Sequence, residues 1–458
     1  MATPAILGLG NPLLDISVEV KDLALLDRYG LKMGNAILAA AEHQPLYAEI
    51  VRDFAGAAGG VQYIAGGATQ NTIRVAQWVS GKPAGYAAYV GAVGDDAFGK
   101  TLAAAAAADG VSALYEVTAE KPTGTCAVLV HEQERSLVAN LAAAETLREA
   151  HLDSAPVAAA IASARVVYCA GFPLTHAGGA ASVQRLGKAC AEGGKIFATN
   201  LSAPFIVQVR RAAASGCAAP SALLPRPASH QNPRCGRTRK EGAAGGLSCR
   251  YRAGPPLLPG IQWGTAIRGR QNRCCARAGS RPRLRGCRIT RPDTPSFIDP
   301  QTAPLPYLDP PTHPPTRQFF KETLDKVLPF ADFVFGNELE AEAFAGANGM
   351  AGASNEAVAL KIASLPKASG ARARVAVITQ GAKPTIVAEN GAVRHFEVPP
   401  VAKIVDVNGA GDAFVGGFIA IIAAGGGIDA AVKAGTWAAA HVIGRSGATF
   451  DASVKYHG

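Results

Sequence analysis

The chain has 458 residues, of which 48% are hydrophobic and 6% aromatic, enough to bury the core of one large domain or of two to three ordinary ones. It has no run of about 18 apolar residues, which argues against a transmembrane helix. Its first residues lack the basic stretch of a secretion signal, so we expect a cytoplasmic protein. The cysteines show no C-x-x-C spacing, which argues against a zinc site or a redox pair.

The net charge of +10 comes from one segment of the chain. Residues 209–317 hold 19 Lys and Arg against four Asp and Glu, whereas the rest of the chain holds 26 basic and 31 acidic residues. Six of the nine cysteines also lie in this segment. The segment therefore differs in composition from a chain that is otherwise mildly acidic.

Hydrophobic periodicity predicts alternating strands and helices in the first part of the chain. Strands are expected at 5–10, 16–20, 62–65, 86–93, 165–170 and 195–200, and helices at 22–29, 68–79, 97–108 and 178–192. Three further strands, at 113–117, 125–131 and 136–139, are expected to form a small separate sheet.

A segment rich in Pro, Arg, Ser and Gly interrupts this rhythm at 209–318. Such a composition is typical of disorder, and a loop longer than about 100 residues is not expected inside a compact domain. The flanks, 201–208 and 319–324, would form an ordinary strand–turn–helix unit if they were joined directly. We therefore hypothesise that 209–318 is a translated retained intron.

A second interpretation of this basic insert is that it binds RNA or another polyanion. Aromatic residues are scarce there, which argues against a base-stacking platform. We therefore expect no specific nucleic acid partner.

The alternation resumes after the insert. Helices are expected at 319–328, 338–345, 412–424 and 428–443, strands at 333–335 and 375–379, and a hairpin at 386–398. This order predicts an α/β fold with a largely parallel sheet. Ligands of such sheets bind beyond the carboxyl ends of the strands, and the residues that follow predicted strands are 66–67, Gly171, Asn337, 379–381 and Asp412.

The stretch 405–418 carries the strongest chemical signal. Gly409, Ala410 and Gly411 precede an apolar helix, and small residues there leave backbone N–H groups free to hold an anion. Asp412 follows them, and a carboxylate beside a phosphate is explained if it takes the proton of an attacking hydroxyl. The alternative is that this aspartate only stabilises the first turn of the helix.

An ordered set of motifs resembles the ribokinase-like (pfkB) carbohydrate and nucleoside kinases, and within them the adenosine kinase branch. The motifs are Gly-Asn-Pro-Leu-Leu-Asp at 10–15, Gly-Gly-Ala-Thr-Gln-Asn at 66–71, Asn-Leu-Ser-Ala-Pro-Phe at 200–205, Asn-Glu-Leu-Glu at 337–340, Thr-Gln-Gly at 379–381 and Gly-Ala-Gly-Asp at 409–412. The resemblance implies a three-layer α/β sandwich with a mainly parallel central sheet and a small β lid. One kinase domain would comprise 1–208 and 319–458, with lid pieces at roughly 12–40 and 113–141.

The resemblance also implies roles for matching residues. Those implied in phosphoryl transfer are Asp412 as base, Gly409, Ala410 and Gly411 as anion hole, and Arg135 toward the phosphates. Those implied in adenosine binding are Asn11, Leu13, Asp15, Leu38, Gly66, Gly67, Asn71, Cys126, Leu137, Phe172 and Phe205. Those implied in ATP binding are Thr379, Gln380 and Gly381.

Asn337 and Glu340 would orient Mg²⁺ through water. Their spacing is equally typical of a helix-capping pair, and both interpretations stay open. Without the resemblance, Leu13, Leu137 and Phe205 would be interpreted as core residues.

Two positions depart from the family pattern. Val407 stands where the family usually has Thr, and Pro173 stands where adenosine kinases commonly have a second Phe that stacks on the base. The expected function is ATP- and Mg²⁺-dependent phosphorylation of adenosine to AMP by a monomer. The alternatives are the same chemistry on another nucleoside or sugar, and a catalytically impaired product whose basic insert binds polyanions.

Overall fold

The computed structural model describes residues 3–56, 60–132, 134–208 and 320–458. These residues fall within one unit of the chain. The insert predicted at 209–318 lies outside the described residues.

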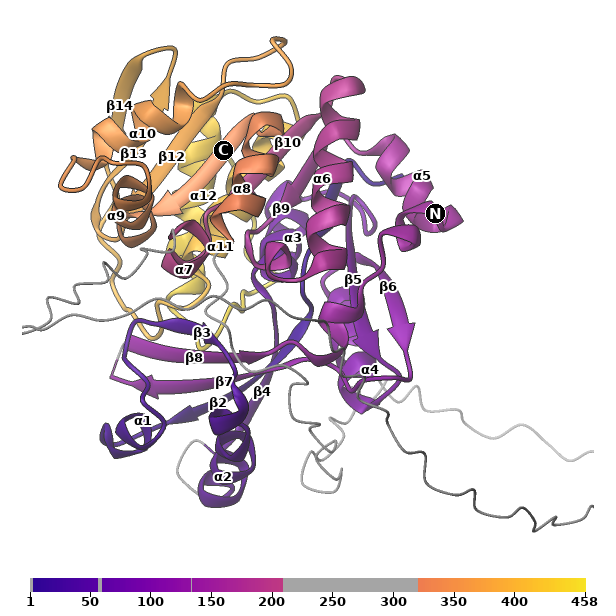
Figure 1. Ribbon diagram of the computed structural model, residues 1–458, viewed down its shortest axis with the longest axis vertical. Helices are drawn as coiled ribbons and strands as arrows, with labels where there is room; N and C mark the ends of the chain where they lie inside the picture. Colours follow the sequence, from indigo (N-terminus) through magenta and orange to yellow (C-terminus); the bar gives the residue numbers. More distant parts are fainter. Residues whose placement is uncertain (1–2, 57–59, 133, 209–319) are drawn as a thin grey trace, which may run out of the picture. The chain divides into compact units, whose positions relative to one another are not determined.

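Two sheets organise this unit (Figure 1). In the described residues the larger sheet has nine strands in the order β14-β13-β12-β11-β10-β9-β1-β5-β6. Their bounds are β1 Ile6–Leu9, β5 Ala87–Gly94, β6 Ser112–Thr118, β9 Val166–Cys169, β10 Ile196–Asn200, β11 Phe333–Asn337, β12 Val375–Gln380, β13 Lys383–Glu389 and β14 Ala392–Phe396. The strands from β6 to β12 in this order run parallel, and β13 and β14 add an antiparallel hairpin. The predicted α/β fold with a mainly parallel sheet is confirmed.

Helices cover both faces of the larger sheet (Figure 1). Along β1, Ile6 joins one hydrophobic core while Leu7 and Leu9 join the other, as the two-residue period of a strand requires. The helices of the Ile6 face are α3 Ala68–Ser80, α11 Ala410–Ala423 and α12 Ile428–Val442. Those of the opposite face are α5 Ala155–Ser163, α6 Ala177–Glu192, α8 Lys321–Val327, α9 Glu338–Ala347 and α10 Asn355–Ala363. The result is the expected three-layer arrangement.

The smaller sheet has the strand order β3-β8-β7-β2-β4 in the described residues. Its strands are β2 Leu13–Glu19, β3 Ala36–Leu38, β4 Gln62–Gly66, β7 Thr125–His131 and β8 Glu134–Asn140. The short helices α1 Ala24–Arg28 and α2 Gln44–Phe54 pack on one of its faces. The helix α4 Ala97–Ala108 contributes Leu102 to a hydrophobic cluster that also contains Leu14 of β2 and Val93 of β5.

The predicted membership of the small sheet was wrong at one strand. Residues 113–117 belong to β6, which pairs in parallel with β5 at the edge of the larger sheet. The strand β4, which the predicted lid pieces omit, pairs antiparallel with β2 instead. An alternating pattern identifies a strand but not its neighbours, so it could not assign either strand to a sheet.

None of the helices in the described ranges combines the length and apolar character that a membrane span requires.

Candidate active site

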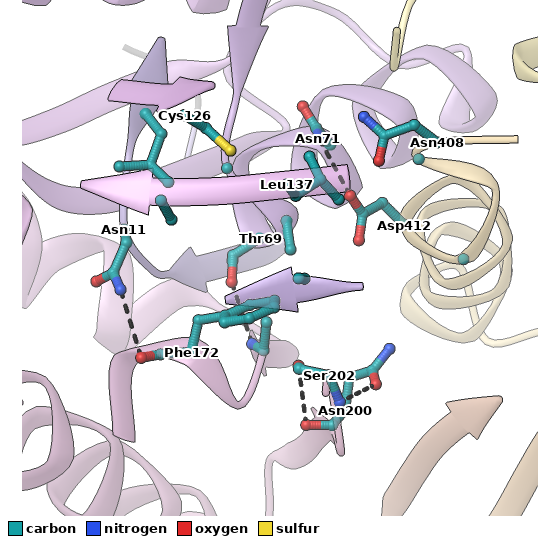
Figure 2. A pocket seen from close by; sticks show the side chains of 18 of the residues that line it. Asn11, Thr69, Asn71, Cys126, Leu137, Phe172, Asn200, Ser202, Asn408 and Asp412 are labelled. Atoms are coloured by element: carbon teal, nitrogen blue, oxygen red, sulfur yellow. Dashed lines mark hydrogen bonds between the residues drawn. The ribbon is translucent and has the colours of Figure 1, made fainter. Parts of the chain in front are cut away.

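A cavity of about 310 Å³ lies between the smaller sheet and the carboxyl ends of the parallel strands. Asn200 and Asn337, which end β10 and β11, line it from the larger sheet, and Leu13 and Cys126 line it from the smaller one. Figure 2 shows Asn71, Asp412 and Asn11 around this space. The cavity therefore lies where an open parallel sheet places its ligand.

The helix α11 begins at the wall of this cavity. Its N-cap, Gly409, has φ 76°, and a Cβ there would lie 2.7 Å from the Cβ of Ala448. Only glycine satisfies both the backbone angle and the space. Gly409, Gly411 and Asp412 line the cavity, so the start of a helix and one carboxylate border the same space. The first N–H groups of a helix have no partner within it, but that of Ala410 donates to the carbonyl of Val407 at 3.3 Å.

Asp412 is held by a residue far away in the chain. The Asn71 side-chain N–H₂ on α3 donates to Asp412 Oδ2 at 3.0 Å (Figure 2). Burial in the cavity raises the pKa of Asp412 to about 7, while the hydrogen bond from Asn71 opposes the rise. A carboxylate with such a pKa is suited to accept a proton near neutral pH.

Asn71 also has an unused acceptor. Its Oδ1 is buried and finds no hydrogen-bond partner among the described residues. A buried amide oxygen without a donor is costly, and a hydroxyl donor from a ligand would satisfy it. This atom supports a hydroxyl-bearing ligand next to Asp412.

Asp15 on β2 faces the cavity from the smaller sheet. Its carboxylate is buried, which raises its pKa to about 7, and the nearby Arg135 opposes this rise. A Cβ at Gly66 would lie 2.3 Å from Asp15 Oδ1, so this glycine makes room for the carboxylate. Gly67 has φ 92°, and its Cβ would meet the carbonyl oxygen of Asn11 at 2.3 Å. The two glycines thus let the start of α3 approach β2 closely.

Apolar side chains form the remaining walls. The apolar residues predicted to bind adenosine that line the cavity are Leu13, Leu38, Cys126, Leu137, Phe172 and Phe205. The ring centroids of Phe172 and Phe205 are 6.4 Å apart. Pro173 also lines the cavity, beside Phe172. A flat aromatic ligand would be enclosed by these walls.

Asn337 and Glu340 form the capping box of α9. The Asn337 Oδ1 accepts from the Glu340 N–H at 2.9 Å, and Glu340 Oε2 accepts from the Asn337 N–H at 3.0 Å. Burial raises the pKa of Glu340 to about 7. No cluster of three or more metal-binding side chains occurs in the described residues. This donor set suits Mg²⁺ held through water and substrate phosphates rather than by a protein cage.

Five predicted site residues do not line the cavity. They are Gly66, Ala410, Arg135, Gln380 and Gly381, whereas Thr379 does line it. Gln380 is used locally, since its Oε1 accepts from Asn355 and its Nε2 donates to the carbonyl of Pro384. Contact of Gln380 and Gly381 with ATP stays a prediction.

Arg135 on β8 forms a buried ion pair with Asp406. Both oxygens of that carboxylate contact the guanidinium, and each also accepts from a backbone N–H group, Oδ1 from Asn408 at 2.8 Å and Oδ2 from Gly447 at 2.5 Å. The pair therefore ties the smaller sheet to the loop that precedes α11. Arg135 does not line the cavity in this arrangement, and its contact with phosphate stays a prediction.

Sequence reasoning missed several polar residues that line the cavity. They are Thr69, Asn200, Ser202 and Asn408. Ser202 has φ 68°, and its N–H donates to Asn200 Oδ1 at 2.8 Å while its hydroxyl accepts from Gly171 N–H at 2.7 Å. The rule that identified Asn337, a polar residue at the end of a predicted strand, applies equally to Asn200 and could have found it.

The chain is similar to known kinases in both sequence and structure. A family model described as pfkB family carbohydrate kinase matches residues 28–225 and 301–455. Adenosine kinase 1 of Arabidopsis thaliana is 35% identical over 447 residues, which cover 97% of this chain and 95% of that protein.

Two solved structures are also similar. The adenosine kinase of Anopheles gambiae in complex with P1,P4-di(adenosine-5) tetraphosphate has a TM-score of 0.71 and 31% identity, with 100% of both chains covered. The adenosine kinase of Schistosoma mansoni in complex with 2-fluoroadenosine has a TM-score of 0.70 and 27% identity, with 98% of each chain covered.

Proposed function

Because the chain belongs to the pfkB family of carbohydrate kinases, we propose that it transfers the γ-phosphoryl group of ATP to the 5′-hydroxyl of adenosine. The products are AMP and ADP. Adenosine is favoured over other nucleosides and sugars because full-length relatives at 32–35% identity are named adenosine kinases. ATP is favoured as donor, and Mg²⁺ as the cofactor that shields the phosphate charge when bound.

The observation that carries this proposal is the Asn71–Asp412 pair at the start of α11. Asp412 takes the proton of the 5′-hydroxyl as the oxygen of that hydroxyl attacks the γ-phosphorus. The bond from that phosphorus to the β–γ bridging oxygen breaks, and ADP leaves. Amides at Gly409 and Gly411 stabilise the charge on the transferred group, because they are fixed at the positive end of the helix dipole.

The remaining residues hold the two substrates. Asp15 accepts hydrogen bonds from the ribose hydroxyls, and Asn71 Oδ1 accepts another from a hydroxyl beside Asp412. The apolar walls enclose the base. Thr379, near the end of β12, would contact ATP, and Asn337 and Glu340 would hold waters of Mg²⁺.

A matched pair of variants tests the role of Asp412. Asp412→Asn should lower kcat by about 10²–10⁴-fold, the usual contribution of a general base. Asp429→Asn is the control, because Asp429 lies in the first turn of α12 with a side chain that is 65% exposed. It should leave kcat unchanged. An Asp412→Asn enzyme with near-normal turnover would refute the assignment.

Substrate choice is tested separately with the wild-type chain. Steady-state rates with adenosine, inosine and ribose at saturating ATP should give the highest kcat/KM for adenosine. A value for adenosine no higher than that for ribose would favour the alternative of a sugar kinase.

We also propose that 1–208 and 319–458 form one kinase domain, with the smaller sheet as its lid, and that 209–318 is not part of it. The family match omits residues 226–300. The ring centroids of Phe205 and Phe320, on either side of the insert, are 6.1 Å apart, so a short connection would join them. Peptide mass spectrometry of the native protein should find a peptide that joins Gln208 to Phe319. Peptides from within 215–310 would contradict the retained-intron hypothesis.

A further inference from the structure

A half-buried histidine, His176, forms a hydrogen bond with a residue of the cavity wall. His176 is the N-cap of α6, and its Nδ1 accepts from the N–H of Gly179 at 3.1 Å. Its Nε2 lies 3.0 Å from Oδ1 of Asn11, a residue that lines the cavity. The Asn11 side-chain N–H₂ donates to the carbonyl oxygen of Phe172 at 3.4 Å. Figure 2 draws this bond as a dashed line.

The protonation of this imidazole follows from its partners. A backbone N–H can only donate, so the Nδ1 that faces Gly179 carries no proton. The proton of the neutral ring is then on Nε2, which donates to Asn11. The Asn11 side-chain oxygen must accept this bond, so its N–H₂ group is turned toward Phe172 and the cavity. The direction of the amide is thus set by the chain of hydrogen bonds from the start of α6.

The surroundings keep the imidazole neutral and in place. Burial lowers the pKa of His176 to about 4, and Glu145, the charged residue that acts on it, only partly opposes this. A Cβ at Gly179 would lie 2.6 Å from Cε1 of His176, so the ring is seated against the bare backbone of the helix. The ring is therefore neutral near neutral pH and lies against the helix backbone.

We propose that His176 is a positioning residue for the substrate: it holds Asn11 so that this wall of the cavity offers a hydrogen-bond donor to an acceptor atom of the nucleoside. The inference rests on the proposed function. The acceptor is either a ring nitrogen of the purine or the 2′- or 3′-hydroxyl oxygen of the ribose. Without His176 the amide of Asn11 is free to turn its oxygen to the cavity, where it would repel that acceptor.

Two substitutions separate this role from the capping of α6. His176→Asn keeps a good N-cap but is too short to reach Asn11. His176→Gln places an N–H₂ group near the position of Nε2 and can restore the bond to Asn11. His43→Asn is the control, because His43 likewise accepts a backbone N–H through Nδ1, that of Ala40 at 2.9 Å. Its partner Ala40 does not line the cavity, whereas Asn11, the partner of His176, does.

The readout is the Kd of adenosine, measured by calorimetry on the full chain, together with KM and kcat. His176→Asn should raise the Kd about tenfold, which corresponds to one hydrogen bond. The KM of ATP should not change, His176→Gln should recover most of the affinity, and His43→Asn should bind like the wild type. An unchanged Kd in His176→Asn, or no recovery in His176→Gln, would overturn the proposal.

Substrate analogues identify the acceptor. The effect of His176→Asn should vanish for one among 1-deaza-, 3-deaza-, 7-deaza-, 2′-deoxy- and 3′-deoxyadenosine, because that analogue lacks the atom that Asn11 contacts. If all five show the full effect, the proposal is wrong. A wild-type protein that does not phosphorylate adenosine would instead refute the proposed function, so the two failures are distinguishable.

Discussion

Gly411 offers the sharpest test of the proposed anion hole, because stability and catalysis should respond differently to a methyl group there. It is the second residue of α11 and lines the cavity. A Cβ at this position would meet no heavy atom of the described residues within 4 Å. The methyl of Gly411→Ala would therefore occupy open cavity, where the phosphate is expected.

The expected magnitudes follow from this geometry. Alanine is better than glycine within a helix by about 0.5–1 kcal/mol, so Gly411→Ala should be as stable as the wild type or slightly more stable. Displacing the phosphate from one backbone donor should lower kcat by about 10²–10³-fold. Gain of stability with loss of activity is not expected from a residue with a purely structural role.

Gly409→Ala is the matched variant and should lower both the stability and kcat. Its φ of 76° costs an alanine about 1–2 kcal/mol. The contact of 2.7 Å with Ala448 adds an overpacking cost of about 1–3 kcal/mol. The melting temperature of Gly409→Ala should therefore fall along with its activity.

The assay is kcat and KM for both substrates, alongside thermal unfolding of each variant. If Gly411→Ala turns over like the wild type, the amides at the start of α11 do not hold the transferred phosphate, and the reasoning is refuted. If Gly409→Ala melts like the wild type, the packing against Ala448 is not as described.

Three other outcomes are expected. Because the pKa of Asp412 is raised to about 7, kcat should increase from pH 6 to pH 8, and a pH-independent kcat would exclude Asp412 as base. The carboxyl binds its proton more tightly in the folded than in the unfolded state, so its contribution to stability is lost as the pH rises from 3.8 to about 7. Arg135→Met should lower the free energy of unfolding by about 3–5 kcal/mol, because it leaves Asp406 as a buried carboxylate without its cation; denaturation showing no loss would contradict this. Deletion of 209–318 should leave kcat/KM for adenosine equal to or above that of the full chain, and an inactive, unfolded product would show that the insert is required.

Much of the site could be predicted from short stretches of sequence. A run of small residues before an apolar helix identified the start of α11 and Asp412, because a helix N-terminus depends on neighbours within one turn. The capping box of Asn337 and Glu340 was also visible in the spacing, and it forms as expected. The alternation of strands and helices was enough for the fold class.

Only the tertiary structure revealed the contacts between residues that are distant in the chain. Asn71 and Asp412 are 341 positions apart, Arg135 and Asp406 are 271 apart, and His176 and Asn11 are 165 apart. Local sequence patterns do not identify such partners, because these contacts depend on which strands become neighbours in each sheet. The same limit explains why β6 was assigned to the wrong sheet: its alternation is equally compatible with both. Sequence alone thus determined the fold class and the residue types of the site, while strand pairing decided which of them meet at the cavity.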